Sequence, residues 1–160
     1  MTKTVVCVDM DGKEYRAPVD SLSWRPSAYG VVIKDGCVLV SEQFGGFVLP
    51  GGGLDLGELP EEAVIREIKE ETGVAVTRPV LVGAESTFFK LPESHQGGFI
   101  QSILLYYACT FVGGELSNEH FTDHDQKHTG MPQWLPLEKV GSVKMSGTID
   151  WRKYVQKSMV

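Results

Sequence analysis

The chain lacks the features that would anchor it in a membrane or bind it to a nucleic-acid backbone. No apolar run reaches membrane-spanning length, and the N-terminal apolar run is too short for a signal peptide. Basic residues are in the minority, with 15 Lys and Arg against 21 Asp and Glu, which gives a net charge of −6. Because backbone binding needs a basic stripe, nucleic acid is disfavoured as a partner. The sequence therefore predicts no membrane contact and a cytoplasmic location.

Cysteine is also scarce, and its pattern excludes a disulfide framework. The three cysteines, Cys7, Cys37 and Cys109, are far apart, odd in number and without a Cys-x-x-Cys pair. Each lies in an apolar run typical of a strand. We expect small buried hydrophobic residues in a reducing compartment.

The length of 160 residues predicts one domain, 1–160, with a core of ordinary size. Apolar runs broken by turn residues predict an N-terminal hairpin extension over 1–20, a loop around 18–26, and a C-terminal amphipathic helix. The fold class is thus α/β with a mixed, hairpin-rich sheet. The expected strands cover 2–8, 13–17, 28–33, 37–40, 47–49, 79–84, 99–112 and 134–135, and the expected helices cover 59–72 and 148–159.

Most of the candidate functional residues follow a run of three glycines, Gly51, Gly52 and Gly53. Glycine lets the backbone approach a ligand closely, and the amide groups of such a run can donate to phosphate. We therefore treat the three glycines as candidate substrate-binding residues, although glycines after a proline are also ordinary turn formers. The helix predicted over 59–72 begins with Pro60 and ends before Gly73, as first-turn proline and C-terminal glycine favour.

Three glutamates of this helix, Glu67, Glu70 and Glu71, share one side at i, i+3 and i+4 spacing. Like charges at this spacing destabilise a helix by roughly a few tenths of a kcal/mol per pair. A divalent cation would reverse the sign, and carboxylate oxygens suit Mg²⁺ or Mn²⁺. The alternative is a solvated helix face that forms surface ion pairs with Lys and Arg. Spacing alone leaves both interpretations open and favours the surface face.

Read from Gly52, the sequence fills the pattern Gly-x5-Glu-x7-Arg-Glu-U-x-Glu-Glu-x-Gly-U, where U is a bulky aliphatic residue. This run, which ends at Val74, resembles the Nudix box at every specified position. A strand before the glycines and a Trp-Leu-Pro-Leu segment from Trp134 to Leu137 also resemble the family. The matching positions are Gly52, Glu58, Arg66, Glu67, Ile68, Glu70, Glu71, Gly73 and Val74.

The resemblance implies an α/β/α sandwich around a mixed sheet. It also implies hydrolysis of a small nucleotide-type substrate, a nucleoside diphosphate linked to another moiety, by water attack at phosphorus with Mg²⁺ or Mn²⁺. By this resemblance Glu67, Glu70, Glu71 and the Gly52 carbonyl are metal ligands. Arg66 steadies the glutamates, and Glu70 or Glu67 is the general base.

Other functions are compatible with the same resemblance. One alternative is a Nudix-fold module that binds or senses a nucleotide without turning it over, although such modules usually have a broken box. RNA decapping is disfavoured by the net charge. Family habit and the N-terminal hairpin are compatible with a homodimer. No marker for a particular substrate subfamily is present.

Two further segments hold candidate residues. Arg25 is a candidate phosphate contact and Trp24 a candidate base platform, although a buried Trp beside a surface Arg is the favoured interpretation. Glu119, Asp123 and Asp125 are candidates for a general base outside the box, in a loop expected over 115–133. His120, His124 and His128 of the same loop have i, i+4, i+8 spacing, which would suit zinc only on a helix.

Overall fold

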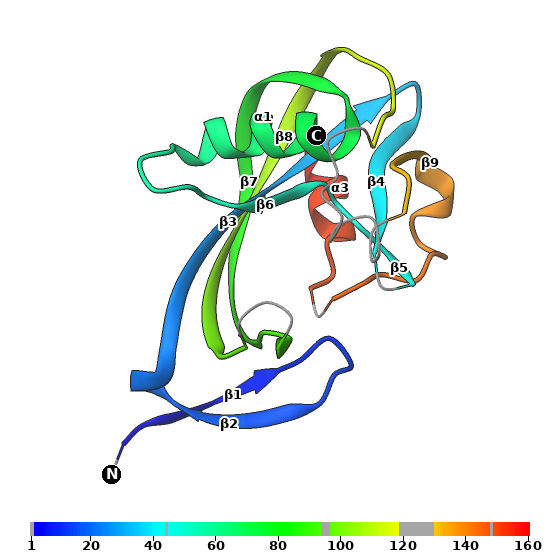
Figure 1. Ribbon diagram of the computed structural model, residues 1–160. Helices are drawn as coiled ribbons and strands as arrows, with labels where there is room; N and C mark the ends of the chain where they lie inside the picture. The colour runs from blue at the N-terminus through cyan, green and yellow to red at the C-terminus, as the bar shows by residue number, and fades with distance from the viewer. Residues whose placement is uncertain (1, 44, 94–96, 119–129, 148) are drawn as a thin grey trace.

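The computed structural model describes residues 2–43, 45–93, 97–118, 130–147 and 149–160, which build a mixed sheet with one helix on each face (Figure 1). Short 3₁₀ turns cover Val19–Ser21 and Leu137–Lys139. The strands are β1 (Thr4–Val8), β2 (Glu14–Pro18), β3 (Leu22–Lys34), β4 (Cys37–Gln43), β5 (Gly46–Val48), β6 (Gly51–Gly53), β7 (Ala75–Lys90), β8 (Phe99–Gly113) and β9 (Gln133–Pro136), and the helices are α1 (Pro60–Thr72) and α3 (Arg152–Ser158).

The strands form one continuous sheet in the order β2-β1-β7-β8-β3-β4-β5, with β6 also on β3 and β9 also on β4. Strands β3 and β8 run parallel from the pair Leu22↔Phe99 to the pair Val32↔Cys109. Strands β7 and β8 are antiparallel. The sheet is therefore mixed, as predicted, and its two longest ladders share β8.

Strand β3 is longer than the sequence predicted. The prediction of a loop around 18–26 is wrong for residues 22–26, which belong to β3. The ladder with β8 continues through Arg25 and Pro26. Proline lacks only the amide donor, and the Pro26 carbonyl still accepts a bond from the Leu54 amide at 3.1 Å. A long-range ladder therefore overrides the local turn signal. Strand β7 is likewise longer than expected, and α3 is shorter, since it begins at Arg152.

Helix α1 has the ends and the apolar face that the sequence predicts. At its start the Leu59 amide donates to the Glu62 carboxylate at 3.0 Å, and at its end Gly73 adopts the left-handed conformation with φ of 76°. Its buried Ala63, Val64 and Ile68 pack on β3 and β8 in one core. The packing is close, because a Cβ atom at Gly30 of β3 would lie 2.4 Å from Ile68 Cδ1.

Helix α3 covers the opposite face of the sheet. Its buried Tyr154 and Val155 join a second core that contains Val31 of β3. The Tyr154 ring stacks on Tyr106 of β8, with ring centroids 3.9 Å apart. Successive residues of a strand face opposite sides, so Val31 belongs to the α3 core and Val32 to the α1 core. The α/β/α arrangement is confirmed.

The predicted N-terminal hairpin is confirmed as β1 and β2, paired from Thr4↔Pro18 to Val8↔Glu14. It joins the sheet through the parallel pair Val8↔Phe89 and lies at the end of the molecule away from α1 (Figure 1).

The predicted free thiols are confirmed for all three cysteines, and the predicted burial is confirmed for two of them. All three are free thiols on strands, Cys7 and Cys109 buried and Cys37 partly exposed. Across the described residues, no helix is long and apolar enough to cross a membrane.

Candidate functional site

The glycine run forms strand β6, which lies between β3 and the acidic side of α1. It pairs antiparallel with β3, and Gly51 opposes Tyr29. The Gly51 amide donates to Glu71 Oε2 at 2.9 Å. A Cβ atom at Gly52 would lie 2.7 Å from the carboxylate of Glu67. Only glycine leaves room for that carboxylate against the backbone, so the run and the acidic helix form one site.

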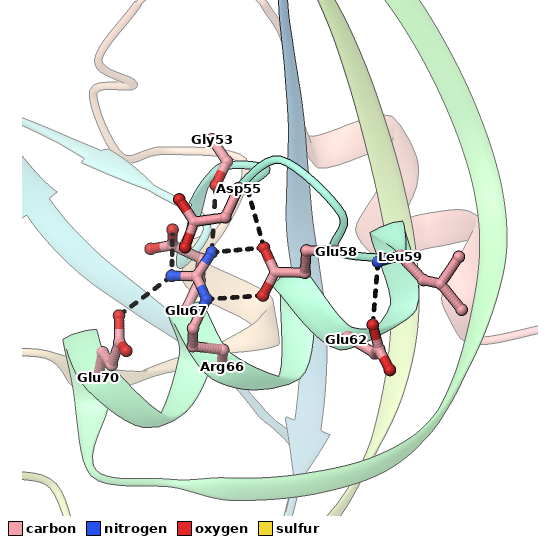
Figure 2. Close-up of polar contacts among 8 residues, drawn as sticks. All are labelled: Gly53, Asp55, Glu58, Leu59, Glu62, Arg66, Glu67 and Glu70. Carbon is pink, nitrogen blue, oxygen red and sulfur yellow. Dashed lines mark hydrogen bonds and ion pairs between the residues drawn. The ribbon is translucent and has the colours of Figure 1, made fainter.

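Arg66 lies at the centre of this site and binds three carboxylates and a carbonyl (Figure 2). Its Nε and Nη2 donate to the two oxygens of Glu58, at 2.7 and 2.8 Å. Its Nη1 donates to Glu67 Oε1 at 2.9 Å and to Glu70 Oε2 at 3.1 Å. Its Nη2 also donates to the Gly53 carbonyl at 3.2 Å. The guanidinium therefore ties the loop before α1, the helix and β6 together.

The local charges shift the pKa values of this cluster in opposite directions. The hydrogen bonds from Arg66, with one from the Asp55 amide, lower the pKa of Glu58 to about 2. Burial raises the pKa of Glu67, and the hydrogen bond and positive charge of Arg66 oppose that shift. The carboxylates, Glu58 above all, raise the pKa of Arg66. A further positive charge beside Glu67 would offset the desolvation of its carboxylate that Arg66 opposes only in part.

The structure brings the three predicted metal-ligand glutamates to one side of α1, but it does not arrange them as a ready cluster. Over the described part of the chain, no three His, Cys, Asp or Glu side chains are grouped to hold a metal ion. In this arrangement Arg66 forms ion pairs with Glu67 and Glu70, and the Gly51 amide donates to Glu71.

The donor set nevertheless fits a hard divalent cation. Arg66 uses only Oε1 of Glu67 and Oε2 of Glu70, and within the described residues the second oxygen of each carboxylate accepts no hydrogen bond. The side chain of Glu70 is half exposed, at 52%, whereas that of Glu67 is 16% exposed. Carboxylate and backbone carbonyl oxygens are the ligands that Mg²⁺ and Mn²⁺ prefer.

Arg25 also reaches the glycine strand, although the sequence predicted it to lie in a loop. A Cβ atom at Gly53 would lie 3.5 Å from Arg25 Nε, so the exposed Arg25 guanidinium lies beside that glycine. The neighbouring Trp24 is 69% exposed, which contradicts the expected buried Trp. It faces away from Arg25, and the α1 core on this strand begins only at Ala28.

Tyr29 is a site residue that the sequence reasoning missed. It opposes Gly51, and a Cβ atom there would lie 2.8 Å from Tyr29 Cδ1. Burial raises the pKa of Tyr29. The positive charge of Arg25 opposes this rise, and the negative charges of Glu71 and Glu67 add to it, so the Tyr29 hydroxyl interacts electrostatically with both Arg25 and the acidic side of α1. Alternate residues of a strand share one face. A prediction of a strand over this segment would therefore have placed Tyr29 on the same face as Arg25.

The other sequence candidates lie outside the described residues. These are the proposed outside bases Glu119, Asp123 and Asp125, and the three histidines of the same loop. Their roles stay predictions.

Comparison with known proteins identifies the family. Residues 24–156 match the family model described as the NUDIX domain. An ADP-ribose pyrophosphatase from Methanocaldococcus jannaschii is 38% identical over 92 residues, which are 54% of this chain and 51% of that protein. An RNA pyrophosphohydrolase from Bartonella quintana is 26% identical over 119 residues, 70% of this chain and 66% of that protein. The match thus spans about half the length of the first relative and just under two thirds of the second.

A solved structure agrees with the family match. The MutT protein from Bacillus halodurans superposes with a TM-score of 0.61 at 26% identity, over 76% of this chain and 74% of that one. The family model covers the glycine strand, α1 and the Trp134 segment together. With the sequence pattern from Gly52 to Val74 intact and both helices on the expected faces of the sheet, this chain belongs to the Nudix hydrolase family.

Proposed function

We propose that this protein hydrolyses the diphosphate linkage of a nucleoside diphosphate joined to another moiety, with Mg²⁺ or Mn²⁺ as its cofactor. The observation that carries the proposal is the contact between β6 and α1. The Glu67 carboxylate lies against Gly52, and the Gly51 amide holds Glu71. One relative is named an ADP-ribose pyrophosphatase and another an RNA pyrophosphohydrolase, which supports diphosphate chemistry.

Glu67, Glu70, Glu71 and the Gly52 carbonyl are the proposed metal ligands. When bound there, Mg²⁺ or Mn²⁺ supplies a Lewis acid that neutralises phosphate charge and lowers the pKa of water. Arg66 keeps Glu67 and Glu70 at fixed positions through Nη1, and Glu58 fixes Arg66 in turn. The chain thereby supplies a rigid acidic surface beside a strand without side chains, along which a diphosphate can lie.

The proposed reaction is attack of water at one phosphorus of the diphosphate, which forms a P–O bond to the water oxygen and breaks the bridging P–O bond, so that the other phosphate leaves with its part of the substrate. Glu70 or Glu67 accepts the proton of the attacking water, since both carry an oxygen that Arg66 does not use. The backbone amide of Gly53 and the Arg25 guanidinium are the proposed contacts of the phosphate groups, since the Gly52 amide faces its ladder partner Ala28. The Gly51 amide already donates to Glu71, so it positions that ligand rather than the substrate. A cytoplasmic location and a homodimer stay predictions from the sequence.

A product analysis tests the proposal. The purified protein is incubated with Mg²⁺, and separately with Mn²⁺, against nucleoside triphosphates, ADP-ribose, nucleotide sugars, dinucleoside polyphosphates and NADH. Glu70→Gln should lower the turnover number by about 10²- to 10⁴-fold, which is the usual contribution of a general base. Glu138→Gln is the matched control, because Glu138 is exposed in the 3₁₀ turn after β9. Equal activity of Glu70→Gln and wild type would refute the assignment.

The binding-module alternative gives a different result in the same assay. If no compound is cleaved but one of them raises the melting temperature, the protein binds a nucleotide without hydrolysing it. The intact box and the full set of Arg66 contacts favour hydrolysis over this alternative.

A further inference from the structure

Two tyrosines and two glycines lie in one line across four neighbouring strands. Gly83 of β7 opposes Tyr106 of β8. Tyr106 in turn opposes Tyr29 of β3, which opposes Gly51 of β6. Residues that oppose one another in a sheet direct their side chains to the same face, and here the two tyrosine rings are stacked with centroids 5.6 Å apart. The line therefore crosses the sheet on the face that α3 covers, and it ends at the glycine strand.

Helix α3 adds a third ring at the far end of this line. The Tyr154 ring stacks on Tyr106, with ring centroids 3.9 Å apart and ring planes inclined by 12°. It also lies directly over Gly83, because a Cβ atom there would be 2.3 Å from Tyr154 Cε1. Glycine at that position lets the helix approach β7 closely. Tyr154, Tyr106 and Tyr29 together are called the tyrosine row below.

Polar contacts fix Tyr154 at its own end of the tyrosine row. Its hydroxyl donates to Glu85 Oε1, and Lys153 forms an ion pair with the same carboxylate. Glu85 lies on β7, so both contacts tie α3 to the strand over which the ring lies. Tyr154 and Tyr106 are both buried. Because protein interiors are close-packed, two buried and stacked rings have little room to shift independently.

At its other end the tyrosine row meets the strand that binds a proposed metal ligand. A Cβ atom at Gly51 would lie 2.6 Å from Tyr29 Cα and 2.8 Å from Tyr29 Cδ1, so the two strands are in tight contact here. The Gly51 amide donates to Glu71 Oε2 at 2.9 Å. A shift of Tyr29 would therefore move the donor that orients Glu71.

Strand β6 depends on such contacts, because its three glycines have no side chain with which to fix their own position. The strand is held by its ladder with β3 and by the side chains that pack against it. The Glu67 carboxylate of α1 lies against Gly52, and the Tyr29 ring lies against Gly51. Tyr29 packs on the core that contains Tyr154, so the packing of α3 reaches β6 through this ring.

We propose that the tyrosine row positions the metal site: Tyr154 packs on Tyr106 and through it on Tyr29, and this stack fixes the Gly51 amide and thereby Glu71. Helix α3, which contributes none of the proposed ligands, sets the order of the site from the opposite face of the sheet. This inference rests on the proposed function for the identity of the bound ion. It adds three positioning residues that act on a ligand through β6.

The first experiment follows the Gly51 amide by NMR in isotope-labelled, metal-free protein. Tyr154→Leu removes the ring and keeps an apolar side chain. Val155→Ala is the matched control, because Val155 is equally buried on the same helix and in the same core but is not part of the tyrosine row. Both variants lose stability, so the unfolding free energy does not distinguish them. The position of the Gly51 resonance does, as long as each variant is folded.

Tyr154→Leu should shift the Gly51 amide resonance, and Val155→Ala should leave it at the wild-type position. The Tyr154 ring lies over β7 and β8, and β3 separates it from β6, so the shift must be relayed through the tyrosine row. An unchanged Gly51 resonance in Tyr154→Leu would overturn the proposal. An equal shift in Val155→Ala would overturn it too, because any disturbance of α3 would then suffice.

The second experiment measures Mn²⁺ affinity by electron paramagnetic resonance without nucleotide. Tyr154→Leu should weaken binding about 10-fold, the lower range for residues that support metal ligands. A cavity of about 250 Å³ on this face has Tyr106 and Tyr29, but not Tyr154, among its described lining residues, so the substitution leaves its walls in place. Tyr154→Phe keeps the stacked ring and should bind Mn²⁺ like the wild type. Equal losses in both variants would assign the effect to the Glu85 bond and overturn the stacking route.

A double-mutant cycle tests the route from α3 to β6. Tyr29→Leu breaks the tyrosine row at its other end, so it should also weaken Mn²⁺ binding about 10-fold. If Tyr154 acts through Tyr29, adding Tyr154→Leu to Tyr29→Leu should cause no further loss. Two losses that multiply would mean a separate route, such as the bond from Trp151 to the Phe47 carbonyl of β5, and would overturn the proposal. Should Tyr154→Leu fail to fold, wild-type affinity of Tyr29→Leu would overturn it alone.

The outcomes also separate this inference from the proposed function. If diphosphates are cleaved in a Glu70-dependent reaction while Tyr154→Leu changes neither the Gly51 resonance nor Mn²⁺ affinity, the inference fails and the proposed function stands. If the wild type binds no Mn²⁺ and cleaves no diphosphate while Tyr154→Leu still shifts the Gly51 resonance, the proposed function fails. The tyrosine row then still positions β6, and only the bound ion has been misidentified.

Discussion

Arg66 and Glu58 are joined by two parallel hydrogen bonds, from Nε to Oε1 at 2.7 Å and from Nη2 to Oε2 at 2.8 Å. This fork-to-fork geometry is the strongest form of an arginine–carboxylate pair. It orients Nη1 toward Glu67 and Glu70. Glu58 therefore acts on the proposed ligands through Arg66, and its removal should affect both stability and the order of the site.

The pair predicts a specific pH dependence of stability. The pKa of Glu58 is lowered to about 2 in the folded protein, below its ordinary value near 4.5. A lowered carboxyl pKa contributes stability above the unfolded value, and this contribution is lost as the pH falls from about 4.5 toward 2. Glu58→Gln should thus lose stability at pH 7 and show a smaller further loss on acidification. Urea denaturation at pH 7 and pH 3 measures both.

Glu138→Gln is the matched control for this prediction, since it removes an exposed carboxylate outside the Arg66 network. It should retain the wild-type dependence on pH. If Glu58→Gln and wild type lose the same stability on acidification, the lowered pKa of Glu58 is not the cause.

Gly52→Ala should weaken metal binding while the fold persists. The new Cβ atom would lie 2.7 Å from the Glu67 carboxylate, and a flexible side chain can move away from it. Moving that carboxylate displaces a proposed ligand, so Mn²⁺ affinity measured by electron paramagnetic resonance should fall at least 10-fold, the lower range for disturbed metal sites. Gly113→Ala, with no atom within 4 Å of its Cβ, should bind Mn²⁺ like the wild type. Wild-type affinity of Gly52→Ala would exclude Glu67 as a ligand.

Gly30→Ala should destabilise the fold through overpacking. Its Cβ atom would lie 2.4 Å from Ile68 Cδ1 and 3.2 Å from Val64 Cγ2, both on the buried face of α1. Inserting a carbon into a packed core typically costs about 1–3 kcal/mol. Urea denaturation should show this loss, whereas Gly141→Ala, which meets no atom within 4 Å, should lie close to the wild type. A neutral Gly30→Ala would mean that α1 sits further from β3.

The tryptophans provide a matched pair for burial. Trp151 is 3% exposed and donates to the Phe47 carbonyl at 2.9 Å, whereas Trp24 is 69% exposed. Trp151→Ala should cost about 3–5 kcal/mol of unfolding free energy, as for other buried aromatic residues. Trp24→Ala should change it by less than about 0.5 kcal/mol, as for most surface positions. A comparable loss in both variants, measured by urea denaturation, would show that Trp24 is covered in solution.

Local signals were sufficient to predict α1 and its acidic side. Pro60 at the first turn, the apolar stripe and Gly73 at the end are all short-range features, because a helix is built from contacts three and four residues apart. The same periodicity placed Glu67, Glu70 and Glu71 on one side. The hairpin of β1 and β2 is local as well, since its strands are joined by a short turn.

Local signals failed where a strand is fixed by a distant partner. The segment from Leu22 to Pro26 has no strand pattern of its own, and its ladder partner β8 lies far along the chain. The Ser102 hydroxyl, for example, donates to the Arg25 carbonyl across 77 positions. That pairing leaves Trp24 exposed and brings Arg25 beside Gly53, and neither position follows from sequence distance.

The sequence by itself thus indicated the family, the spacing between the glycine run and the acidic helix, and the identity of the candidate ligands, because these depend on spacing within one continuous segment. The tertiary structure alone decided which oxygens Arg66 occupies, that Tyr29 lies against Gly51, and that a cavity lies across β6 from the glutamates. These features depend on how far apart the strands, the helix and the C-terminal segment pack. Packing distances are set by side chains from several elements at once, which no single stretch of sequence contains.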